Sequence, residues 1–373
     1  MKKFLLSFSV LAIFLTACSS SDEGGTVVPG DSFDRKAMLE NMADNMIIPA
    51  YQNFSNDMSA LKDAATNFTT TTNEDNFNNL RSTWSDAYIS WQSVNIFEIG
   101  KAEELSFRNF MNVYPVNTTN IESNISSGSY DLTAVSQQDE QGFAALDYLI
   151  NGLSDTDAAT IAFYTDGTNG TNYRNYLMDV VNRMDVLTTT IVTDWTNGYR
   201  DTFVNNSGSS ATSSVDKIVN DYLFHFEKHL RAGKIGIPAG VFAQGETFPD
   251  KVEAFYDGGF SKTLFMANLK AMQDFFNGKH FSSATTGESF NTYLDFLNTI
   301  KEGEDLAKLI NDQFDVAKTT ASGLNDDFSS QIKTNNTSML RVYDELQKNV
   351  IFLKVDMLQA LSISVDFVDA DGD

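Results

Sequence analysis

The sequence predicts an all-helical fold in two halves. Apolar residues recur at steps of three and four along most of the chain, which is the period of amphipathic helices. Only 5 prolines occur in 373 residues, so long helices can form without interruption. A Ser/Gly/Thr-rich stretch at residues 205–214 marks a boundary between residues 33–204 and residues 215–373.

The start of the chain predicts export and lipid attachment. Two lysines precede a short apolar run at residues 4–15, which is typical of a signal peptide ending at residue 17. The run ends in Leu15-Thr16-Ala17-Cys18, which resembles the lipobox of bacterial lipoproteins, and acylation would then fall on Cys18. Cys18 is the only cysteine, so a disulfide within the chain is excluded.

Residues 18–32 are small and polar and predict a flexible tether behind the anchor. We therefore expect a lipoprotein of the bacterial outer membrane, on its periplasmic face or at the cell surface. The acidic pair Asp22-Glu23 resembles the surface-export signal of some lipoproteins, and a plain solvated linker explains it equally well.

The composition is acidic, with 26 basic and 50 acidic residues and a net charge of −24. Such a charge repels phosphate backbones and anionic lipid, so nucleic-acid binding is excluded and membrane contact is left to the acyl chains. It attracts cations, although acidity also keeps an exported protein soluble. Three histidines are few for a catalytic zinc protein, and 29 phenylalanines provide for a large core.

The first half opens with helical periodicity over residues 33–68, which Pro49 is expected to break or kink. A second strong helix is predicted over residues 76–99, with Leu80 and the aromatic residues Trp84, Tyr88 and Trp91 on one stripe. This stripe continues onto Asn95 and Glu98, so two polar groups extend an apolar row. Both are candidates for a polar pocket.

The segment 139–151 places one acid on an otherwise apolar helical face. At about 100° per residue, Asp147 falls between Phe143 and Ile150. Two interpretations are open. Asp147 is either a buried acid satisfied by a neighbouring amide or arginine, or an acid that lines a polar pocket.

The remainder of the first half is predicted as loop and helix. Residues 117–138 read as loop with a short helical piece, and Gly-rich turns are expected at 151–152 and 166–172. A long helix is then predicted over residues 173–203.

The second half begins with a predicted helix over residues 215–233 that carries His225 and His229. These share a face, but Glu227 points almost opposite, so the segment is not the His-Glu-x-x-His motif of zinc peptidases. A structural role, weak binding of a divalent ion or another ligand, and a catalytic role remain open for the two histidines.

Further helices are predicted over residues 262–276, 289–301, 304–319 and 338–361. His280 is expected in a solvated turn. Residues 361–367 alternate apolar and polar side chains, which is compatible with a short extended piece. Residues 369–373 contain a fragment of a calcium-loop pattern without its terminal glutamate and are read as a solvated tail.

The segment Gly142-Phe143-Ala144-Ala145-Leu146-Asp147-Tyr148-Leu149 resembles the signature of the imelysin family, Gly-x-His-x-x-Glu in an apolar helix. Gly142 keeps the glycine, Ala144 stands where the family has histidine, and Asp147 stands where it has glutamate. Residues 84–100, the Tyr114-Pro115 turn and residues 233–240 resemble other family segments. The resemblance implies two helical bundles, with internal duplication as one origin, and a polar pocket that Glu253 and Tyr256 would join.

The family resemblance implies one of two functions: a metallopeptidase, or a non-catalytic component of the uptake of iron or another metal. A divalent or ferric ion is the expected metal. Alanine has no ligand atom, so Ala144 and Asp147 cannot hold a metal as the family pair would. We therefore predict a binding lipoprotein with Asp147, Glu98, Asn95, Glu253 and Tyr256 as pocket candidates. A metal-uptake or surface receptor is the expected partner, and a surface module that binds a glycan or another protein is a third alternative.

Overall fold

The computed structural model describes residues 31–367, and their regular secondary structure is helical apart from one pair of short strands, so the all-helical prediction is confirmed. The only strands of this part are the antiparallel two-residue pair β1 (Ile300–Lys301) and β2 (Glu304–Asp305). The predicted signal peptide, Cys18, most of the tether and the tail at 369–373 lie outside the described residues. Within residues 31–367, no helix is long and apolar enough to cross a membrane.

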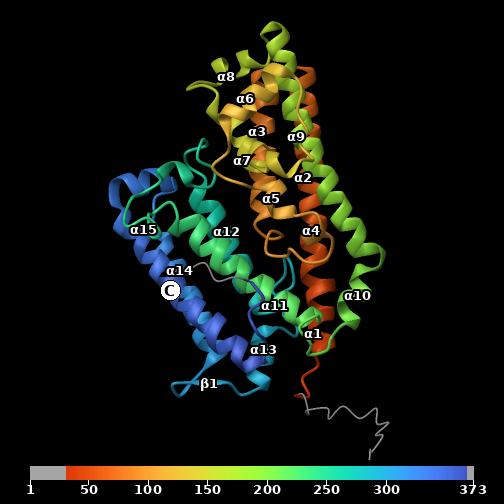
Figure 1. Ribbon diagram of the computed structural model, residues 1–373, viewed down its shortest axis with the longest axis vertical. Coiled ribbons are helices and arrows are strands. Elements are labelled where there is room, and N and C mark those ends of the chain that lie inside the picture. Colours follow the sequence, from red (N-terminus) through yellow and green to blue (C-terminus); the bar gives the residue numbers. More distant parts are fainter. Residues whose placement is uncertain (1–30, 368–373) are drawn as a thin grey trace, which may run out of the picture. The chain divides into compact units, whose positions relative to one another are not determined.

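Three long helices organise the first half: α2 (Ile48–Thr70), α3 (Glu74–Trp91) and α9 (Gly167–Asp194). Figure 1 shows them running alongside one another, and α2 contacts both α3 and α9. Their apolar stripes meet in the interior, as the helical period requires. The shorter helices are α1 (Arg35–Asn41), α4 (Lys101–Glu104), α5 (Phe107–Met111), α6 (Thr118–Ser127), α7 (Gly142–Asp147), α8 (Asp157–Phe163) and α10 (Arg200–Asn205).

The second half is built from α11 (Ser214–Phe224), α12 (Ser261–Phe276), α14 (Leu306–Ser322) and α15 (Phe328–Ile351). A π-helical segment, His225–Gly236, continues α11 and contacts α15 and α12. The short helices α13 (Phe290–Phe296) and α16 (Leu358–Leu361) complete it. In Figure 1, α14 and α15 run side by side, in agreement with their contacts.

The two halves share their interior. Helix α12 contacts α3, and α1 contacts α11. Core residues from both halves, such as Phe97 and Phe275 with ring centroids 4.9 Å apart, belong to one hydrophobic cluster. The junction between the halves is therefore a packed surface, and polar groups within it must find partners there.

At Pro49, where a break or kink was expected, the chain stays helical. A π-helical segment, Met42–Ile47, precedes it, and Pro49 lies in the first turn of α2. The missing N–H of Pro49 is tolerated because the Asn45 carbonyl, four residues earlier, accepts from the Phe281 N–H at 2.8 Å instead.

The prediction of a helix through residue 99 was wrong, because α3 ends at Trp91. Asn95 lies in the turns that follow and Glu98 in the irregular segment after them, so neither extends the aromatic stripe of the helix. Side chains from elsewhere satisfy the backbone at this point. Asn268 donates to the Gln92 carbonyl at 2.9 Å and Arg108 donates to the Asn95 carbonyl at 2.5 Å.

The glycine-rich stretch at 166–172 was expected as a turn, but α9 already begins at Gly167. A Cβ added at Gly170 would lie 2.8 Å from the Tyr164 carbonyl oxygen, so glycine allows close packing against α8 and the turn after it. Helix α8 was not predicted.

Two helix ends also differ from prediction. Helix α13 stops at Phe296 and leads to the β1–β2 turn, where Glu302 and Gly303 have φ of 55° and 88°. Helix α15 starts at Phe328, ten residues before the predicted start at residue 338. Residues 362–367 form no strand, since Asn220 bonds the Ser364 carbonyl and the Asp366 N–H in place of a neighbouring strand.

Candidate functional site

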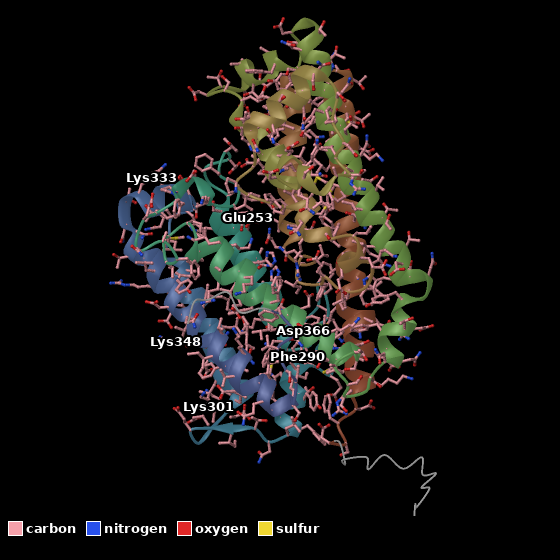
Figure 2. The ribbon with its side chains drawn as sticks, viewed as in Figure 1. Glu253, Phe290, Lys301, Lys333, Lys348 and Asp366 are labelled. Carbon is pink, nitrogen blue, oxygen red and sulfur yellow. The ribbon has the colours of Figure 1, made fainter. Side chains whose placement is uncertain are left out.

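A buried polar network lies at the junction of the two halves. It joins the turn after α3, the helix α5, the π-helical segment His225–Gly236, the helix α12 and the loop 252–257. Figure 2 labels Glu253, which comes from this loop and belongs to the centre of the network. Chain segments far apart in sequence supply these groups, so only tertiary packing assembles them.

Lys234 and Glu253 form the central ion pair. Both side chains are buried, at 4% and 2% exposure. Gln92 joins them, accepting from Lys234 Nζ at 2.9 Å and donating to Glu253 Oε1 at 3.2 Å. Asn112 donates to the same oxygen at 2.8 Å, and its own Oδ1 accepts from the Tyr88 hydroxyl at 2.7 Å. Burial lowers the pKa of Lys234, and Glu253 opposes that shift.

Asn95, Asn268 and His225 extend the network. Asn268 Nδ2 donates to Asn95 Oδ1 at 2.8 Å, and Asn268 Oδ1 lies 3.0 Å from His225 Nε2. An amide oxygen only accepts, so Nε2 carries the hydrogen of a neutral imidazole. Burial lowers the pKa of His225 well below its ordinary value and that of His229 to about 3. The two rings stack with centroids 5.3 Å apart.

Arg108 connects the network to Glu98 and Asp221. The guanidinium is 5% exposed and binds Glu98 Oε2 at 3.1 Å and Asp221 Oδ1 at 2.8 Å. Burial raises the pKa of both acids, and Arg108 is the main influence in the opposite direction. Asp221 Oδ2 also accepts from the Glu98 backbone N–H at 2.7 Å. One arginine thus pairs with two acids and joins the two halves.

Asp147 binds the backbone of the loop at residues 252–257, which carries Glu253. Its side chain is 1% exposed. Oδ1 accepts from Asn151 Nδ2 and from the Asp257 backbone N–H, both at 2.9 Å, and Oδ2 accepts from the Tyr256 backbone N–H at 2.8 Å. Of the two interpretations of this acid, the geometry matches the first, a buried carboxylate satisfied by amides.

The glycine that begins this segment is required by its surroundings. Gly142 has φ of 80°, and a Cβ there would lie 2.2 Å from the Met111 carbonyl oxygen. Phe143, which follows, stacks on Tyr88 with ring centroids 4.5 Å apart. Helix α7 is thereby held against α3 and α5, and Asp147 at its end reaches the loop of the second half.

We expect Asp147 to make stability depend on pH. Burial raises its pKa from 3.8 to about 7, against the opposing hydrogen bonds. Because the folded chain then binds more protons than the unfolded chain, the unfolding free energy falls as pH rises through this interval. The slope is at most about 1.4 kcal/mol per pH unit. Denaturant unfolding of the native chain and of Asp147→Asn, between pH 4 and pH 8, measures it.

The quantity to compare is the unfolding free energy of the native chain minus that of Asp147→Asn, because other titrating groups cancel in the difference. We expect this difference to decrease towards pH 7 and then level off. A difference that stays constant or increases over the same range contradicts the raised pKa.

The comparison with known families decides where the chain belongs. The family model described as Imelysin matches residues 47–350, which is more than half of the 373 residues. The chain belongs to the imelysin family. This confirms the family that the α7 segment indicated, although Ala144 and Asp147 depart from the signature.

Two solved structures share the fold of this imelysin-family chain. One is described as an iron-regulated protein A precursor from Parabacteroides distasonis, with 17% identity and a TM-score of 0.69, covering 87% of this chain and 95% of that chain. The other is an imelysin-like protein from Psychrobacter arcticum, with 17% identity and a TM-score of 0.67, covering 89% and 97%. No curated protein matches the chain.

A metal does not fit at the signature position of this imelysin. Ala144 offers no donor atom, and each oxygen of Asp147 faces at least one N–H group. N–H groups present partial positive charge where a cation would have to bind. Nor does any group of three or more His, Cys, Asp or Glu in residues 31–367 have an arrangement that could hold a metal ion.

The structure brings most of the predicted site residues together. Glu253, Asn95 and Glu98 belong to the network, His225 lies at its edge, and Asp147 and Tyr256 anchor the adjoining loop. Glu98 also lines a cavity of about 190 Å³, together with Asp221. None of the three cavities described within residues 31–367 is lined by Asp147, Asn95, Glu253 or Tyr256, so a ligand role for them stays a prediction.

Five residues of the network were not predicted from the sequence: Gln92, Arg108, Asn112, Lys234 and Asn268. The sequence did contain an indication that Arg108 and Lys234 are buried, since each stands beside apolar residues in a chain with few basic residues. The three amides gave no signal, because asparagine and glutamine also occur throughout the exposed loops.

Proposed function

We propose that this imelysin is a non-catalytic binding component of the bacterial cell envelope, tethered by a lipid on Cys18 and linked to the uptake of iron or another metal. The assignment of a non-catalytic role rests on the hydrogen bonding of the Asp147 carboxylate. Both of its oxygens accept from N–H groups, beside an alanine at the metal-binding position of the signature.

The rest of the network supports the same conclusion. Lys234 pairs with Glu253, and Arg108 pairs with both Glu98 and Asp221, so these acids already have cationic partners within the junction. His225 faces an amide, and a peptidase would need a nucleophile or an activated water next to a base. In residues 31–367 the hydrogen-bond partner of His225 is the side chain of Asn268, and no nucleophilic side chain is bonded to either ring nitrogen.

The location and the metal link have separate support. The basic and apolar start of the chain and the sequence before Cys18 support export and lipid attachment. The relative from Parabacteroides distasonis is described as iron-regulated, which supports a relation to iron. A net charge of −24 favours the accumulation of cations near the surface.

The proposal is tested by iron uptake in cells that lack the protein. Under iron limitation we expect such cells to accumulate labelled iron more slowly than cells complemented with the full chain. Complementation with Cys18→Ala is expected to restore less iron uptake than complementation with the native chain, because the lipid anchor is lost. Equal uptake with and without the chain contradicts the link to iron.

The metallopeptidase alternative provides the control. The purified full chain, supplied with zinc or iron salts, is expected to leave a denatured protein substrate intact. Cleavage that a chelator stops and that Asp147→Ala abolishes would overturn the non-catalytic assignment.

A further inference from the structure

A second candidate site lies on the other side of α3 from the polar network. A cavity of about 530 Å³ opens between α2, α3, α12 and residues 279–282. This volume lies in the range of small-molecule sites, roughly 300–1,000 Å³. None of the network residues Gln92, Asn95, Lys234, Glu253 and Asn268 lines it, so it is independent of the site described above.

One wall of the cavity is apolar, and the residues that form it come from both halves of the chain. Ile96, Phe97 and Phe275 are buried core residues that also line the cavity. Met46, Ala50 and Ala271 continue this wall. Such a wall can receive the apolar body of a ligand.

The rim formed by α2 and α3 is acidic. Asp57 and Asp86 both line the cavity, and neither forms an ion pair with Lys or Arg in the described chain. Partial burial raises the pKa of Asp57, and the charge of Asp86 raises it further. Asn53 donates to Asp57 at 2.9 Å and fixes the orientation of its carboxylate. Two adjacent acids beside an apolar wall provide what an organic cation requires.

The opposite rim does not provide a matching anion site. Lys270 and Lys279 line it, but both form ion pairs with Asp274, which lines the same cavity. Two lysines and one aspartate give this rim a formal charge of +1, against −2 for Asp57 and Asp86 at the other rim. A ligand carboxylate would also face the net charge of −24 on the chain.

We propose that this cavity binds a small organic cation, a primary amine with an apolar body. The ammonium group would lie between Asp57 and Asp86, and the apolar body would contact Ile96, Phe97 and Phe275. Binding at this cavity does not depend on the proposed role in metal uptake, and either proposal can fail without the other.

Calorimetry on the full chain with three probes of similar shape tests the charge preference. The probes are phenethylamine, phenethyl alcohol and phenylacetate, which are cationic, neutral and anionic near pH 7. We expect the amine to bind at least about tenfold more tightly than the alcohol, with the acetate weakest. Equal or tighter binding of the alcohol or the acetate, or no binding of the amine, overturns the proposal.

Matched substitutions locate the binding. Asp57→Asn and Asp86→Asn are each expected to weaken phenethylamine binding by at least about fivefold. Asp63→Asn, an exposed acid on the same helix as Asp57, lies outside the cavity and should leave the affinity unchanged. Asp86 is exposed, so its variant keeps the fold. An equal loss with Asp63→Asn shows general attraction to an acidic protein and contradicts a specific site.

Discussion

Replacing Arg108 by methionine is expected to lower the unfolding free energy by about 3–5 kcal/mol, as the removal of one partner of a buried ion pair typically does. The guanidinium is 5% exposed and binds Glu98, Asp221 and the Asn95 carbonyl. Methionine fills much of the volume but leaves two acids facing each other without a cation. Denaturant unfolding at pH 7 measures the loss.

The loss should shrink at low pH, because protonation removes the charge from both acids. Adding Glu98→Gln and Asp221→Asn to Arg108→Met should recover part of the stability for the same reason. Arg200→Met is the matched control. Arg200 pairs with Asp44 and Asp201 at the surface, where acid side chains are 43% and 74% exposed, so we expect a change below about 1 kcal/mol. Similar losses for Arg108→Met and Arg200→Met would contradict the role of burial.

Lys234→Met is expected to produce a loss of similar size, about 3–5 kcal/mol, since it leaves Glu253 charged and buried. Gln92 and Asn112 still donate to Glu253, but hydrogen bonds from neutral amides do not replace an ammonium charge. The loop 252–257 carries Glu253 and is fixed by Asp147, so we also expect faster amide exchange at Tyr256 and Asp257.

The double variant Lys234→Met with Glu253→Gln separates lost charge pairing from lost packing. If the unpaired charge causes most of the loss, the double variant is more stable than Lys234→Met alone. Strict additivity of the two single losses would show that the pair is not coupled. Lys308→Met serves as a control, since Lys308 and its partner Asp312 are 64% and 56% exposed.

Arg108→Met and Lys234→Met both test the buried polar network. The polar network crosses the junction between the halves, and its charges are paired inside the protein. None of the cavities described within residues 31–367 reaches Lys234 or Glu253 at the centre of the network, and Glu98 and Asp221 at its edge line a cavity of about 190 Å³, whereas the cavity beside Asp57 measures about 530 Å³. This contrast is the reason to look for small-molecule binding at the second site.

The residues of α7 show how far sequence reasoning reached. Periodicity placed Asp147 on the buried face, and the structure confirms its burial. The partners of Asp147 could not be predicted, because Tyr256 and Asp257 donate through backbone N–H groups that have the same chemistry in every residue except proline. For Asn95 and Glu98 the helical period was extended past Trp91, where bonds from Asn268 and Arg108 replace those of the helix.

The sequence by itself determined the helical class, the acidic charge and the departures from the family signature, because periodicity, composition and residue identity are local properties. Only the tertiary structure decided which polar groups meet. Lys234 and Glu253 are joined by Gln92, which lies 142 residues before Lys234, and nothing near any of the three in sequence indicates the contact. Burial then makes that pairing necessary, since a charge removed from water is stable only beside its partner.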